Sequence, residues 1–93
     1  MQKNSFYSVL LVLLLSSLAF ANKRIEALHQ SAYELLDTNT DSAFTLATIA
    51  LEEAKTNREP YLEAQSLFIQ AYIYRMNNNM GESFLANLEA LKV

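Results

Sequence analysis

The stretch from Thr40 to Thr56, TDSAFTLATIALEEAKT, decides the fold. Its apolar residues recur every three or four positions, which is the period of one face of an α-helix. They are Phe44, Ala47, Ala50, Leu51 and Ala54, with Leu46 and Ile49 beside them. The small residues in this row allow another helix to approach closely. We expect Thr40 or Asp41 to cap the first turn.

Short polar turns divide the rest of the sequence into further helices. We expect helices over residues 23–37, over residues 60–76, and from about residue 79 to the end. Pro60 suits the first turn of a helix, where its missing N–H costs nothing. Asn79 followed by Glu82 resembles a capping box. The chain is therefore predicted to be all-α, with four helices in two antiparallel hairpins.

The two predicted hairpins are similar to each other. A fixed offset along the chain aligns four identical pairs of residues. These pairs are Asn39 with Asn79, Phe44 with Phe84, Ala50 with Ala90, and Leu51 with Leu91. They fall on turn and core positions, where a helical-hairpin repeat constrains its residues. The sequence therefore predicts an internal repeat.

This pattern resembles the tetratricopeptide repeat family. The first helix of the second hairpin carries the family's small and aromatic pair as Ala71 and Tyr74, and the second helix carries small residues at Ser83 and Ala90. Asn87 departs from the pattern, because the family usually has an aromatic residue there. The resemblance implies an α-solenoid fragment of about two repeats. Repeat one covers residues 23–57, and repeat two covers residues 59–93 and is truncated.

The predicted repeat is longer than the family's usual period of about 34 residues. A longer repeat of this kind, with a phrase such as the one over residues 32–36, resembles the N-terminal repeats of envelope sensor proteins of Gram-negative bacteria. In those proteins, repeats precede a membrane helix and a histidine-kinase or helix-turn-helix output domain.

Residues 1–21 have the three parts of a secretory signal peptide. A positively charged start precedes an apolar run over residues 9–15, and Ala19-Phe20-Ala21 forms an A-x-A cleavage site before Asn22. We expect cleavage after Ala21, which leaves a repeat domain over residues 22–93 in the periplasm or outside the cell. The alternative is an uncleaved anchor in the inner membrane. The two basic residues after the apolar run favour it, because they blur the charge asymmetry that orients such segments.

Composition excludes several classes of function. The 93 residues carry 7 Lys and Arg against 10 Asp and Glu, for a formal charge of −3. A nucleic-acid partner would need a basic face. There is no Cys, and there are only one His and one Gly, which argues against thiolate zinc sites, multi-histidine metal sites and Gly-rich phosphate loops. We therefore expect no cofactor, no metal site and no catalytic residue.

The family resemblance implies a concave groove that binds a protein or peptide partner and is lined by the first helix of each hairpin. By position, its candidate residues are Glu26, His29 and Tyr33 in repeat one, and Gln65, Phe68, Tyr72 and Arg75 in repeat two. Aromatic platforms with a few polar anchors suit extended or helical peptides. The alternative is that these aromatic residues belong to the core, as is usual at helical spacing. His29 is expected to be a solvated helix residue, because a metal site needs several convergent ligands.

Three functions remain, in order of preference. The first is an exported, non-enzymatic interaction module with a partner in the cell envelope. The second is the N-terminal sensing fragment of a longer histidine kinase or helix-turn-helix regulator. A small enzyme ranks third, because the sequence has no nucleophile–base set. Two repeats make an incomplete array, so the face formed by Phe84, Leu88 and Leu91 is expected to need a further repeat, a partner or a second copy of the chain.

Overall fold

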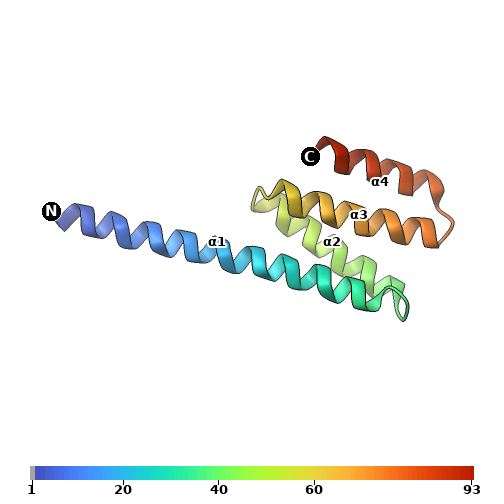
Figure 1. The fold of residues 1–93 in the computed structure, drawn as a ribbon, viewed down its shortest axis with the longest axis horizontal. Helices are drawn as coiled ribbons and strands as arrows, with labels where there is room; N and C mark the ends of the chain where they lie inside the picture. Colours follow the sequence, from blue (N-terminus) through green and yellow to red (C-terminus); the bar gives the residue numbers. More distant parts are fainter. Residues whose placement is uncertain (1) are drawn as a thin grey trace.

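A computed structural model describes the backbone of residues 2–93 and the side chains of residues 7–15 and 19–93. Met1, the first residue of the expected signal peptide, lies outside the described residues. The described chain consists of helices α1 (Gln2–Leu35), α2 (Thr40–Thr56), α3 (Pro60–Met76) and α4 (Met80–Lys92), with no strand among them (Figure 1). The all-α prediction is confirmed, α3 has the predicted bounds, and α2 ends at the predicted residue.

Helix α1 is longer than the helix expected over residues 23–37. It begins at Gln2 and ends at Leu35. Neither Gly nor Pro lies between the apolar run and Lys23, so no residue interrupts the helical hydrogen bonds there. Its amino-terminal half extends beyond the other helices (Figure 1), which makes the molecule elongated, with extents of 62 × 28 × 12 Å.

The helix starts differ from the predicted caps. Asn39 is the N-cap of α2, rather than either of the two residues that follow it, and its side-chain oxygen accepts a hydrogen bond from the Ser42 N–H at 3.1 Å. Asn79 makes no side-chain cap bond at the start of α4, so the predicted capping box is absent. The Asn79 N–H instead closes the preceding turn on the Tyr74 carbonyl at 2.7 Å. This backbone hydrogen bond holds Asn79 in the turn.

The turns after α2 and α3 share one geometry. After α2, the Glu59 N–H bonds to the Ala54 carbonyl at 2.9 Å, and the equivalent bond after α3 is the one from Asn79. Arg58 and Asn78 lie within these turns in the left-handed region, with φ of 53° and 63°. These are Schellman-type helix ends. Asn tolerates this backbone conformation, whereas an arginine adopts it at a steric cost.

The helices pack in chain order, and α1 also contacts α3 (Figure 1). Small side chains on α2 allow this arrangement, because they let α1 and α3 both lie close to its backbone. The fully buried residues of α2 are Ala43, Ala47, Ala50 and Ala54. The larger residues packed around them are Ile25 of α1 and Leu62, Ile69 and Ile73 of α3. The resulting core joins the two hairpins, and α1 and α3 run in the same direction.

Helix α4 adds to this core along one face only. Ala90 packs against Leu51 and Leu67, which ties α4 to the two preceding helices. On the opposite side Phe84 is 63% exposed and Leu91 is 77% exposed. The apolar face predicted for this helix is therefore exposed in the chain, and what covers it stays a prediction.

Candidate functional site

Aromatic side chains of α1 and α3 surround an open hollow. Tyr33 of α1 and Phe68 and Tyr72 of α3 are all between 43% and 51% exposed. Together with Leu36 and Ile69, they line a space of about 350 Å³. Three of the predicted groove residues therefore lie around one hollow. This surface is apolar, apart from the two tyrosine hydroxyls.

A smaller hollow of about 170 Å³ lies between α3 and α4. Phe68 and Tyr72 line this hollow as well, so these two rings form a wall common to both spaces. Arg75 and Asn87 are the polar residues at the mouth of the smaller hollow that keep exposed side chains. The Arg75 guanidinium lies over the Tyr72 ring, 5.5 Å from its centroid. Such a contact is attractive because the face of the ring is negative.

Ser83 fixes the far side of the smaller hollow. It is buried, and its hydroxyl donates a hydrogen bond to the Ala71 carbonyl of α3 at 2.8 Å. This bond holds the start of α4 against α3, one turn away from Arg75. The small residue predicted here from the repeat pattern therefore also positions α4.

His29 is buried, so the expectation of a solvated histidine is wrong. Its imidazole lies on the same face of α1 as Ile25 and Ala32, and its Nε2 lies 2.6 Å from the Ser66 hydroxyl of α3. Ser66 donates its single hydroxyl proton to the Leu62 carbonyl at 3.0 Å, which leaves its oxygen to accept from the His29 Nε2–H. This hydrogen bond assigns a proton to Nε2 of the imidazole.

Burial also sets the charge state of His29. Desolvation lowers the pKa of this imidazole below its ordinary value of 6.5, and the nearby Glu26 carboxylate opposes the shift. His29 is thus a structural link between α1 and α3 and presents little surface to a ligand. The spacing of residues 25, 29 and 32 was the signal in the sequence that could have indicated its burial.

The remaining groove candidates, Glu26 and Gln65, do not line either hollow. Glu26 is exposed on α1. The Gln65 amide donates to the Tyr61 hydroxyl at 3.4 Å, one turn earlier on α3. The structure therefore brings together Tyr33, Phe68, Tyr72 and Arg75, and leaves these two residues beside the group.

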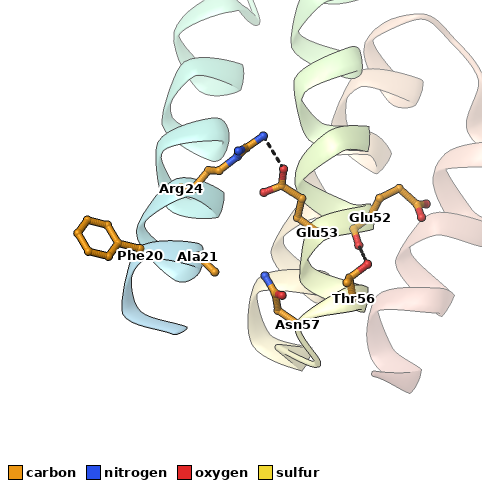
Figure 2. Close-up of a pocket in the computed structure, with 7 residues that line it drawn as sticks. All are labelled: Phe20, Ala21, Arg24, Glu52, Glu53, Thr56 and Asn57. Atoms are coloured by element: carbon orange, nitrogen blue, oxygen red, sulfur yellow. Dashed lines mark hydrogen bonds and ion pairs between the residues drawn. The ribbon is translucent and has the colours of Figure 1, made fainter. Parts of the chain in front are cut away.

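The predicted cleavage site borders a third hollow, between α1 and α2 (Figure 2). Phe20 and Ala21 contribute the α1 side of this hollow of about 450 Å³, and Asn57 lies across from them. Arg24 bridges the two helices through an ion pair with Glu53, with a distance of 2.9 Å between Nη2 and Oε1. None of the α2 residues that line this hollow is among the candidate residues predicted from the sequence.

The buried part of α1 begins just beyond that site. Ala19 and Phe20 are exposed, Ala21 and Asn22 are partly exposed, and Ile25 is the first fully buried residue among the described side chains of α1. The side-chain oxygen of Asn22 is buried and has no hydrogen-bond partner. The boundary between exposed and packed helix thus falls within a few residues of the predicted cleavage point.

Two further features of the chain bear on its function. Among the described residues, no three His, Asp or Glu side chains lie close enough together to hold a metal ion. The segment Tyr7–Leu35 of α1 is long and apolar enough to cross a membrane, judged by length and composition alone. This property is shared by signal sequences and membrane anchors. In comparisons with known proteins, no protein-family model, no curated protein and no solved structure matches the chain.

Proposed function

We propose that this chain is an exported, non-enzymatic interaction module of the tetratricopeptide type, and that it binds a protein or peptide of the cell envelope on the surface formed by α1 and α3. One observation carries the proposal. Tyr33, Phe68 and Tyr72 surround an open hollow and are about half exposed, while the residues beside them, such as Ile69, are buried. Exposed aromatic residues gathered at a concave site are typical of binding surfaces.

The family assignment rests on the helical arrangement and on the repeat pattern in the sequence. Two antiparallel hairpins that share a core, with the first helix of each hairpin on one side, are the arrangement that such repeats adopt. The aromatic residues at issue come from these first helices. This geometry supports the proposed groove.

Export through the apolar segment is part of the same proposal. Removal of residues 1–21 would leave the buried residues of α1 in place, because they begin at Ile25. It would also remove the run over residues 9–15, whose side chains are between 44% and 60% exposed. An uncleaved anchor in the inner membrane is the alternative. Mass spectrometry of the amino terminus in cell fractions separates the two, since a start at Asn22 supports cleavage and a start at Met1 in the membrane fraction supports the anchor.

The binding surface is tested by affinity capture from envelope extract. The chain and its Phe68→Ala/Tyr72→Ala variant are compared at equal concentration, after circular dichroism has shown equal helicity. A matched control removes one exposed aromatic ring elsewhere, in Tyr61→Ala, since Tyr61 is 73% exposed and lines neither hollow. We expect the first variant to lose its partner and the control to keep it. Equal recovery by all three proteins would refute the groove assignment.

A second candidate function is favoured by the exposed face of α4. In an array of repeats, a further helix would cover Phe84, Leu88 and Leu91, so the chain would serve as the sensing region of a longer kinase or regulator. A reading frame that continues past Val93 into an output domain would support this candidate. A stop codon directly after Val93 in the genomic DNA would count against it.

A further inference from the structure

Arg75 carries a positive charge with no acidic partner in the described chain. The one ion pair between described side chains joins Arg24 of α1 to Glu53 of α2. Asp37, near the carboxyl end of α1, forms no ion pair with Arg75 either. The Arg75 guanidinium contacts the face of the Tyr72 ring. This contact uses none of the guanidinium N–H groups in a hydrogen bond to oxygen. The donors of Arg75 are therefore available to a ligand.

The position of this charge relative to the apolar hollow restricts the ligand. Phe68 and Tyr72 separate the large apolar hollow from the smaller one that contains Arg75 and Asn87. A ligand that lies across these two rings would place an apolar group on one side and meet a guanidinium on the other. Carboxylate is the protein group that the planar guanidinium binds best, through two parallel hydrogen bonds. The exposed Asn87 amide adds a further donor at the same mouth.

We propose that this surface binds a peptide segment in which an acidic side chain lies within four positions of a large apolar side chain. The apolar group enters the hollow beside Tyr33 and Ile69, and the carboxylate pairs with Arg75. In an extended peptide, residues two apart point to the same side and are separated by about 7 Å, and in a helix residues three or four apart are neighbours. Either spacing spans one aromatic ring. This inference rests on the proposed binding function and specifies the partner's chemistry.

The net charge of the chain bears on the origin of a preference for acidic peptides. The protein is acidic overall, with a formal charge of −3, so long-range electrostatics disfavour an acidic peptide. A preference for acidic residues must therefore come from local contacts, and Arg75 is the cation at the hollow. Because the pair is partly exposed, salt weakens it.

The test is an array of short synthetic peptides with both ends blocked. Two positions, either two or four residues apart in a Gly/Ser background, carry every combination of amino acids. The array is probed with the full chain in detergent micelles and with the Arg75→Gln, Arg75→Lys and Phe68→Ala/Tyr72→Ala variants. Arg58→Gln serves as the control for loss of an exposed charge. A second array with free carboxyl termini shows whether a terminal carboxylate replaces the side chain.

We expect the native chain to prefer peptides that pair Asp or Glu with Leu, Ile, Met or Phe. Replacement of Glu by Gln in the peptide, or of Arg75 by Gln, should weaken binding about three- to fivefold. Arg75→Lys should retain part of the preference, and Arg58→Gln should retain all of it. An unchanged preference in Arg75→Gln, or binding that requires a free carboxyl terminus, would overturn this inference and leave the groove standing.

The array also separates this failure from that of the proposed function. If the Phe68→Ala/Tyr72→Ala variant binds the same peptides with equal strength, the groove itself is misplaced. If the native chain binds no peptide above background, both the groove and the acidic preference are refuted.

Discussion

The buried contact between His29 and Ser66 makes the stability of the fold depend on pH. The pKa of His29 lies below its ordinary value of 6.5, because burial disfavours the charged imidazole more than Glu26 favours it. In the unfolded chain the pKa returns to its ordinary value. Between these two pKa values the unfolded state binds more protons than the native state, so stability falls as the pH is lowered. The contribution of His29 is complete above pH 6.5 and is lost progressively as the pH falls toward the folded pKa.

The size of the effect has a clear upper limit. If the native imidazole stays neutral throughout, the free energy of unfolding falls by about 1.4 kcal/mol between about pH 7.5 and pH 5.5. Glu26 opposes the shift, so we expect the loss to stay below this limit. A core of this size rarely supplies more than about 3–5 kcal/mol, so this loss is a large fraction of the total. Carboxyl groups ordinarily titrate near pH 4 and contribute little over this range.

Urea unfolding of the full chain in micelles, followed by far-ultraviolet circular dichroism across this pH range, measures the effect. The control is His29→Gln, whose amide can still donate to Ser66 but does not titrate near neutral pH. We expect the native chain to lose stability toward pH 5.5 and the variant to show a nearly flat profile. Parallel profiles for the two proteins would refute the assignment of His29 as a buried neutral group.

Further predictions concern the packing, the turns and the ion pair, and all are measured as changes in the urea midpoint at neutral pH. Ala47→Leu should lower stability by about 2–3 kcal/mol, because its site is fully buried between helices, and a smaller loss would show that α1 and α3 can separate freely. Arg58→Gly should raise stability by about 0.5–1 kcal/mol by relieving the left-handed backbone, so destabilisation would contradict the turn geometry. Asn39→Ala should cost about 1 kcal/mol through loss of the N-cap, whereas no change would remove that role. Glu53→Gln should change stability by less than about 0.5 kcal/mol, because the Arg24 side chain in the pair is 69% exposed, and a larger loss would mean that the pair is better shielded.

The fold could be predicted from the sequence because the helical period of the apolar residues and the positions of the polar turns agree with each other. The helical period of the apolar residues indicated the buried face of α2, and the polar turns indicated the end of α2 at Thr56 and the bounds Pro60–Met76 of α3. The start of α1 did not follow, because a leader segment and a repeat helix were treated as separate units. Both segments are made of good helix formers, so the backbone continues through them without a break.

The candidate site was predicted only in part, because the position of a residue on a helix does not determine how deeply its side chain is buried. Tyr33, Phe68 and Tyr72 were assigned to one surface by their register, and all three line one hollow between α1 and α3. His29 had the same register-based assignment, yet it is buried, because Ser66 on the facing helix offers both the space and a hydrogen-bond partner. That partner lies 37 residues away in the sequence, and no local pattern identifies it.

The alanine row of α2 connects the core to the candidate site. Because the fully buried positions of α2 are all alanines, α1 and α3 can lie on it closely enough to contact each other. That approach brings His29 within hydrogen-bond distance of Ser66, and it allows Tyr33 to share a hollow with Phe68. A bulky side chain at Ala47 would therefore be expected to weaken peptide binding as well as stability, although no residue of α2 lines the hollow. The shape of the proposed binding surface is thus set by the smallest residues of the core.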